Sequence, residues 1–222
     1  MILAAGRGER MRPLSDKTPK PLLRVGGKPL IVGTLERLRT AGVSEFVINH
    51  AHLGHQIEAM LGDGARFGVS IQYSSEEQTG ALETAGGIAN ALGLLGDQPF
   101  IAAAGDIYCE FDYGHLVRHH LGDCSAHLVL VANPAHNPKG DFALDGSTLR
   151  NCGEVLHTFS GIGLYHPGLL AGILPGSRSK LAPLLRQAAD AGKASGELHH
   201  GIWQDIGTPE RLALLDRELS RH

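Results

Sequence analysis

Cysteine is scarce in this sequence, and long apolar runs are missing. The three cysteines, Cys109, Cys124 and Cys152, show no CxxC spacing, so neither a disulfide framework nor a zinc knuckle is expected. No stretch approaches the ~20 apolar residues of a membrane span, and the apolar run before Arg7 is too short for a signal peptide. We therefore expect a cytoplasmic protein with no membrane partner.

Neither sign of charge dominates the chain. The formal net charge is -3 with 19% charged residues, which argues against a basic nucleic-acid-binding protein, and 42% hydrophobic residues argue against disorder. Glycine, by contrast, is abundant: 30 of 222 residues, roughly twice the average usage. These glycines follow no collagen or linker period, so they indicate tight turns or close approaches to a ligand.

Short apolar runs alternate with helical patterns along the first half. Strands are expected at 1–3, 45–48, 69–73, 100–104 and 127–131, and helices at 31–41, 53–61 and 88–95. This alternation predicts an α/β fold with a mostly parallel sheet covered by helices on both faces.

The second half of the chain is less regular. Strand-like pieces at 141–149 and 155–165 predict an antiparallel extension, followed by helices at 180–191 and 209–219. No repeat or linker divides the sequence, so we expect one domain over 1–222.

Chemically distinctive residues follow four of the expected strands. They are the loop from Gly6, then Asn49, Asp106 and Asp205. Ligands of open parallel sheets bind outside the carboxyl ends of the strands. The sequence therefore predicts a ligand site where these four ends meet.

The first loop, Ala4-Ala5-Gly6-Arg7-Gly8-Glu9-Arg10-Met11-Arg12, has the chemistry of a polyphosphate cradle. Glycines let backbone N–H groups approach phosphate oxygens, and arginines add charged donors. A plain tight turn is the alternative reading. A dinucleotide fingerprint would need glycine where Met11 stands, and no Walker ending occurs, since Gly27-Lys28 is followed by Pro29.

Lys20 lies between Pro19 and Pro21, which predicts an ammonium group fixed on a stiff extended segment. A solvent lysine in a loop is the alternative reading. Asp106 and Asp205 match what Mg²⁺ takes from proteins, namely one or two carboxylates with the remaining ligands from water and phosphate. A loop aspartate near a helix start is the alternative for Asp205. The segment 74–80 reads as a solvated turn or as a lid over a base.

Thirteen histidines, among them His50, His52, His55, His115 and His119, raise the question of a metal site. No cysteine or carboxylate accompanies them at ligand spacing. We expect surface or loop histidines.

Four motifs together resemble those of the sugar-phosphate nucleotidyltransferases. The matching runs are AAGRGERMRPLSDKTPKPLL at the start, LETAGG at 82–87, Gly105-Asp106, and DIGT at 205–208. The resemblance spans nearly the whole chain and implies a Rossmann-like three-layer α/β/α sandwich. It also implies Mg²⁺ as cofactor and UTP and a sugar 1-phosphate as substrates, with no nucleic-acid partner.

The resemblance carries roles to individual positions, with the sugar-binding part at roughly 133–200. Catalysis would fall to Arg10, Lys20, Asp106 and Asp205, the two aspartates holding the metal. Sugar binding would fall to Gly140, Asp141 and Glu154. The nucleotide would contact Ala5, Gly6, Gly8, Glu9, Arg10, Lys20, Asn49, Glu83 and Gly86.

Two departures from the family pattern leave specificity open. Ala104 stands where relatives place asparagine before Gly-Asp, and the common Glu-Lys-Pro sugar motif is missing. Glucose- or mannose-1-phosphate with dTTP, CTP or GTP is therefore an alternative reaction. A non-catalytic nucleotide-sugar sensor is the alternative of another class, disfavoured because Arg10, Lys20, Asp106 and Asp205 are all retained.

Overall fold

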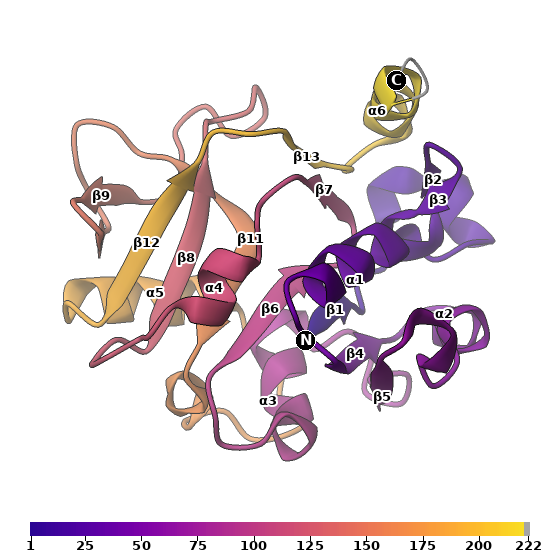
Figure 1. The fold of residues 1–222 in the computed structure, drawn as a ribbon, viewed down its shortest axis with the longest axis horizontal. Coiled ribbons are helices and arrows are strands. Elements are labelled where there is room, and N and C mark those ends of the chain that lie inside the picture. Colours follow the sequence, from indigo (N-terminus) through magenta and orange to yellow (C-terminus); the bar gives the residue numbers. More distant parts are fainter. Residues whose placement is uncertain (220–222) are drawn as a thin grey trace.

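A nine-stranded sheet, in the order β5-β4-β1-β6-β11-β8-β12-β10-β9, forms the centre of the computed structural model, which describes residues 1–219 (Figure 1). Its strands are β1 (Ile2–Ala4), β4 (Glu45–His50), β5 (Ser70–Ser75), β6 (Phe100–Ala104), β8 (Ala126–Val131), β9 (Ala143–Asp145), β10 (Thr148–Arg150), β11 (Thr158–Tyr165) and β12 (Ala194–His199). The expected α/β class is confirmed.

The first half of the sheet is parallel, as predicted. β1 pairs with β4 on one side and β6 on the other, and Leu3 is opposite both Asn49 and Ala104. β5 continues the parallel order beyond β4. The carboxyl ends of β1, β4 and β6 therefore lie at one edge, where the loops after them meet.

The second half differs from the prediction in the position of one strand. We expected 155–165 in an antiparallel extension, but β11 lies inside the sheet, antiparallel to both β6 and β8. Most of its residues are buried, because it is apolar on both faces. The hairpin β9–β10 forms the extension at the edge, and β12, which the apolar pattern missed, runs parallel to β8.

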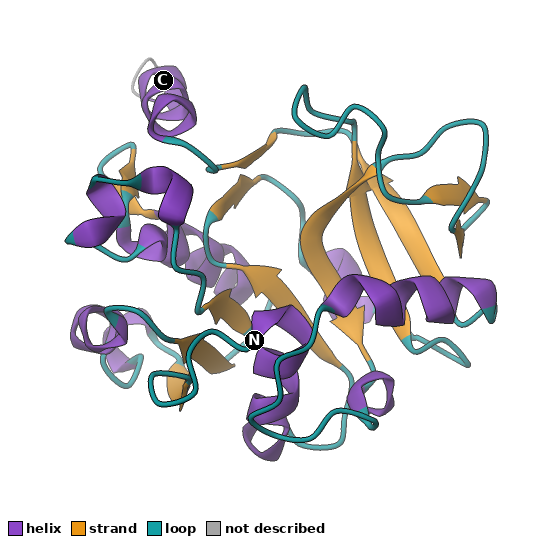
Figure 2. Cartoon of the chain, turned by 180° about the vertical axis from the view of Figure 1, so that it is seen from behind, coloured by secondary structure: helices purple, strands orange, loops and turns teal. Residues whose placement is uncertain are grey.

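Helices cover both faces of the sheet, which gives the three layers. α1 (Leu30–Thr40), α2 (Gly54–Leu61) and α4 (Gly114–Arg118) pack into one apolar core. α3 (Glu83–Leu95) and α5 (Leu181–Asp190) pack into a second core on the opposite face, which Figure 2 brings to the front. The helix expected at 88–95 begins earlier, at Glu83.

Two small sheets and a third apolar cluster connect the first loop to the last helix. β2 (Arg24–Val25) pairs with β3 (Lys28–Pro29), and β7 (Ile107–Cys109) pairs with β13 (Trp203–Asp205). Met11 of the first loop packs in this cluster with Ile206 and with Leu215 of α6 (Pro209–Leu219). Among residues 1–219, no helix is both long and apolar enough to cross a bilayer.

Candidate functional site

The first loop lines a cavity of about 590 Å³ at the carboxyl edge of the sheet. Gly8 has φ 62° and precedes a turn of 3₁₀ helix, Glu9–Met11. A Cβ at Gly8 would lie 3.2 Å from Lys20 Cβ, and Ser15 Oγ donates a hydrogen bond to the Gly8 carbonyl at 2.8 Å. Glycine is therefore required for the loop to fold against Lys20. Ala5, Gly6, Arg7, Gly8, Glu9 and Arg10 all line the cavity.

Lys20 points to Asp106 across this cavity. Its Nζ lies 2.5 Å from Asp106 Oδ2, and its side chain is only 12% exposed. Lys20 opens a 3₁₀ turn, Lys20–Leu22, rather than the expected extended segment. Pro19 and Leu23, on either side of this turn, are extended. Pro21 fits because the missing N–H of proline costs nothing in the first turn of a helix.

Asp205 reaches the same edge through the pairing of β13 with β7. Asp205 is opposite Ile107, and Ile206 N donates to the Asp106 carbonyl at 3.3 Å. Arg211 Nη1 contacts both Asp205 carboxylate oxygens at 2.8 Å. A Cβ on Gly207 would lie 3.2 Å from Asp205 Oδ2 and 3.5 Å from Arg10 Nη2, so Arg10 and Asp205 flank Gly207.

The donor set at this edge fits a hard divalent cation. Asp205 pairs with Ile107, the residue that follows Asp106, so both aspartates lie at this edge. Their carboxylate oxygens are the ligand type that Mg²⁺ prefers alongside phosphate oxygens. Among residues 1–219, no group of three or more His, Cys, Asp or Glu side chains could hold a metal ion. A metal at this edge would therefore need ligands from the substrate as well.

Asn49 and Glu76 form a buried polar pair at the floor of the cavity. Asn49 Oδ1 accepts from Ala4 N at 3.0 Å, and Asn49 Nδ2 donates to Glu76 Oε1 at 2.7 Å. Glu76 is 1% exposed and also accepts from Leu82 N at 2.8 Å. Both polar side-chain atoms of Asn49 are therefore hydrogen-bonded within the protein. The sequence missed Glu76, which lies in the segment expected as a solvated turn or a lid; within 74–80 the exposed residues are Ser75 and 77–80.

Glu83 and Gly86 occupy different positions. Glu83 lines the cavity with φ 62°, a conformation uncommon outside glycine, and pairs with Arg178 at 2.9 Å. Gly86 lies in α3 and packs against the segment before α5, where a Cβ would overlap the Ser177 carbonyl oxygen. Its backbone N–H donates to Ser179 O at 3.0 Å. Gly86 therefore has a packing role and does not line the cavity.

The three residues assigned to the sugar are not brought together. Asp141 lines a separate cavity of about 260 Å³ that adjoins the first. Gly140 has φ 69°, and a Cβ there would lie 2.6 Å from the Leu156 backbone. Glu154 is exposed and lines another cavity, beside β9 and β10. Gly140 is thus a turn position, and Glu154 is remote from the phosphate loop.

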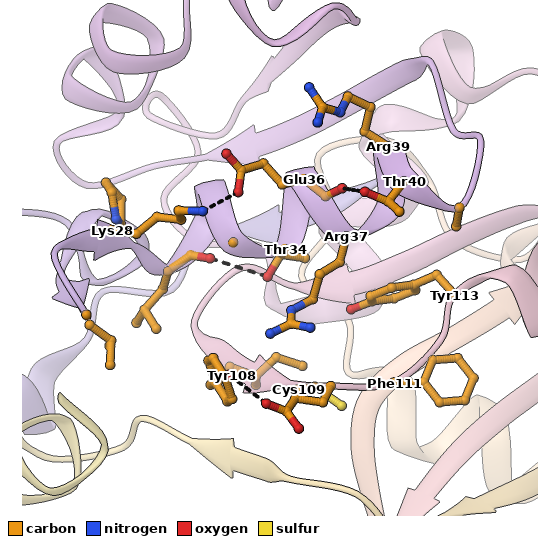
Figure 3. Close-up of a pocket in the computed structure, with 18 of the residues that line it drawn as sticks. Lys28, Thr34, Glu36, Arg37, Arg39, Thr40, Tyr108, Cys109, Phe111 and Tyr113 are labelled. Atoms are coloured by element: carbon orange, nitrogen blue, oxygen red, sulfur yellow. Dashed lines mark hydrogen bonds and ion pairs between the residues drawn. The ribbon is translucent and has the colours of Figure 1, made fainter. Parts of the chain in front are cut away.

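A larger cavity, about 770 Å³, lies between α1 and β7 (Figure 3). Figure 3 shows Lys28 paired with Glu36 at its rim and Arg37 beside Tyr108, 5.2 Å from the ring centroid. Burial raises the pKa of the Cys109 thiol in its wall to about 11. None of the predicted site residues lines it. Asp106 and the phosphate loop line the smaller cavity, and Asp205 lies beside it, next to the lining residue Gly207.

Some histidines are buried, contrary to expectation. His50 is 2% exposed and lies 2.7 Å from Glu58 Oε1. His119 stacks on His127 with ring centroids 3.8 Å apart, and His127 Nε2 lies 3.3 Å from Glu197 Oε1. Burial lowers the pKa of His119, and the hydrogen bond from His127 lowers the pKa of Glu197.

Comparison with known proteins identifies close relatives. A family model described as nucleotidyl transferase matches residues 1–142. The chain is 54% identical over 222 residues to an N-acetylmuramate α-1-phosphate uridylyltransferase of Neisseria meningitidis serogroup B, covering 96% of this chain and 94% of that one. It is 32% identical to the protein of the same name from Caulobacter vibrioides, over 99% and 96% of the two chains.

Comparison with solved structures finds the same fold in other proteins. A crystal structure of a putative glucose-1-phosphate thymidylyltransferase from Bacillus anthracis superposes with a TM-score of 0.86 at 21% identity, covering 100% of this chain and 94% of the other. At that identity the likeness supports the shared fold alone.

Proposed function

Because this chain belongs to the nucleotidyl transferase family, we propose that it joins N-acetylmuramic acid α-1-phosphate to UTP, giving UDP-N-acetylmuramic acid and pyrophosphate. The observation that carries the reaction is the meeting of Lys20, Asp106 and the Gly6–Arg10 loop around one cavity. The sugar and the base come from the 54% identity to a uridylyltransferase for this sugar phosphate. The reaction would serve cytoplasmic recycling of cell-wall sugars, where UTP is available.

In this proposal, a phosphate oxygen of the sugar 1-phosphate forms a bond to the α-phosphorus of UTP. The bond from that phosphorus to the bridging oxygen of the β-phosphate breaks, and pyrophosphate leaves. The nucleophile is already ionised, so no general base is needed. Catalysis then depends on positioning the reactants and stabilising the transition-state charge.

The cations lining the cavity fit this requirement. Lys20 Nζ lies beside Asp106, within the walls formed by the phosphate loop, and would contact the reacting phosphates. Arg10 and the backbone N–H groups around Gly8 would bind the departing pyrophosphate. Asp106 and Asp205 would hold Mg²⁺, which supplies charge neutralisation on the triphosphate when bound.

Release of pyrophosphate tests the proposal. Purified protein is mixed with Mg²⁺, one of UTP, dTTP, CTP or GTP, and the 1-phosphate of N-acetylmuramic acid, glucose or mannose. We expect the highest kcat/KM with UTP and N-acetylmuramic acid α-1-phosphate. Asp106→Asn should remove nearly all turnover, whereas Lys17→Ala should not, because Lys17 is exposed and does not line the cavity.

Two results would contradict the proposal in different ways. Preference for glucose- or mannose-1-phosphate with another triphosphate would keep the chemistry and change the substrates. No pyrophosphate with any combination, from a protein that still binds UTP, would favour a nucleotide-sugar sensor.

A further inference from the structure

A second cavity of about 260 Å³, called the side cavity here, adjoins the cavity of about 590 Å³ that the phosphate loop lines, the phosphate cavity. The two share Glu83 and Thr84, so they adjoin at the start of α3. Its walls combine apolar and cationic side chains. The apolar wall residues are Phe142, Phe159, Leu181, Ala182 and Leu185.

Two carboxylates and two cations line the side cavity, and they do not pair with one another. The two carboxylates that line it are satisfied by the protein: Glu83 pairs with Arg178 at 2.9 Å, and Asp141 Oδ2 accepts from Phe159 N at 2.8 Å. The two cations that line it are Lys180 and Arg186. Among residues 1–219, no carboxylate lies within ion-pair distance of either.

Contacts hold the Arg186 guanidinium in place, whereas for Lys180 they fix the backbone just before it. Ser179, next to Lys180, donates through its N–H to Leu82 O at 2.9 Å and accepts from Gly86 N at 3.0 Å. This fixes the backbone before Lys180 against the start of α3, which packs beside α5. Arg186 lies with its guanidinium carbon 5.1 Å from the Phe142 ring centroid and donates to the Asp141 carbonyl at 3.4 Å.

We infer that Lys180 and Arg186 bind the carboxylate that distinguishes N-acetylmuramic acid from N-acetylglucosamine. This inference rests on the proposed function. The distinguishing group is a lactyl ether, with one carboxylate and one methyl. Lys180 and Arg186, which have no carboxylate partners, would bind the lactyl carboxylate, and the neighbouring apolar walls would contact the lactyl methyl. The pair would therefore determine which sugar 1-phosphate is used.

Paired kinetics on two sugar phosphates test this role. Wild type, Lys180→Met, Arg186→Met and Lys180→Arg are assayed with UTP and either N-acetylmuramic acid α-1-phosphate or N-acetylglucosamine 1-phosphate, as substrate or competitor. Each methionine variant should raise KM for N-acetylmuramic acid α-1-phosphate about 10- to 100-fold. The KM or inhibition constant for N-acetylglucosamine 1-phosphate should stay unchanged. Lys180→Arg should keep most of the wild-type affinity for N-acetylmuramic acid α-1-phosphate, because it keeps the positive charge.

Lys193→Met is the matched control, because Lys193 is exposed just after α5 as Lys180 is just before it. It should behave as wild type. An equal loss on both sugars in the methionine variants would show a general structural effect and overturn the inference, as would no loss on either. Wild type that turns over other sugar phosphates but not the muramic one would instead refute the proposed function, and with it this inference.

Discussion

Lys20 and Arg211 each neutralise one of the two site carboxylates. Lys20 pairs with Asp106 at 2.5 Å and Arg211 with Asp205 at 2.8 Å. Both pairs are partly buried, so the low local dielectric strengthens them relative to surface pairs. Lys20 also packs beside Gly8 of the phosphate loop. We expect the lysine to carry the larger share of transition-state stabilisation.

Lys20→Met is therefore expected to lower kcat by about 10²- to 10³-fold, the usual cost of removing one preorganised charged contact. UTP affinity, measured by calorimetry, should change much less than kcat. Lys17→Met provides the comparison in the same segment. A Lys20→Met enzyme that keeps more than about a tenth of wild-type kcat would remove Lys20 from the mechanism.

Gly87 offers a test of the buried Asn49–Glu76 pair. A Cβ at this position would lie 2.6 Å from Glu76 Oε1 and 2.7 Å from Asn49 Nδ2. Gly87→Ala should lower the free energy of unfolding by about 1–3 kcal/mol, because a methyl group is forced against buried polar atoms. Urea denaturation measures the change.

Gly93→Ala is the control for that experiment. It lies in the same helix, is exposed, and a Cβ there meets nothing within 4 Å. Alanine should stabilise the helix by about 0.5–1 kcal/mol. Equal effects of the two substitutions would show that the space around Gly87 is not restricted.

At the level of elements, periodicity predicted the strands and helices that have a regular apolar pattern. The parallel strands β1, β4, β5 and β6 and the helices α1 and α3 are examples. Periodicity did not place β11 inside the sheet, because strand order depends on long-range pairing that local pattern does not encode. It missed β12, whose Gly196 and Glu197 interrupt the apolar run.

β13 carries Asp205 and is joined to the main sheet through a tryptophan. Trp203 Nε1 donates to the Ser160 carbonyl at 2.9 Å. Trp203→Phe should lower the free energy of unfolding by about 0.5–1.5 kcal/mol and reduce kcat/KM, because β13 then holds Asp205 less firmly.

Tyr108→Phe is the matched change on the paired strand β7. Its hydroxyl bonds Glu110 at an exposed position, so its loss should leave activity near wild type. Unchanged kcat/KM in Trp203→Phe would show that the position of Asp205 does not depend on this hydrogen bond.

At the level of the whole molecule, the sequence indicated most of the phosphate cavity but less of its surroundings. The loop 5–10 and Asp106 were predictable because each follows the end of an expected strand, and Lys20 was predictable from its place between Pro19 and Pro21. Glu76 was not, because an acidic residue in a polar segment normally lies in solvent. Glu154 was misplaced relative to the cavity, because it was assigned by the resemblance alone and lies beyond the β9–β10 hairpin.

Stability of the whole fold should decline in acid through the histidine cluster beside α4. Burial, with the neighbouring His127 and His120 charges, lowers the pKa of His119 below 6.5 in the folded state. The unfolded state therefore binds more protons below that pH, and the free energy of unfolding falls as pH falls. Glu197, whose pKa is lowered from 4.5, adds a further loss at still lower pH.

His119→Gln should make the decline just below pH 6.5 shallower, as measured by denaturant unfolding at a series of pH values. His52→Gln, at an exposed position on another helix connection, is the control. A His119→Gln profile parallel to that of wild type would show that His119 does not contribute to the acid sensitivity.

The fate of the α-phosphorus of UTP distinguishes nucleotidyl transfer from hydrolysis of UTP and from no reaction. UTP radiolabelled at the α-phosphorus is incubated with Mg²⁺, the protein and N-acetylmuramic acid α-1-phosphate, and the products are separated. The account predicts that the label enters the nucleotide sugar while pyrophosphate is released unlabelled. Label remaining in UTP, or appearing only in UMP or UDP, would contradict it.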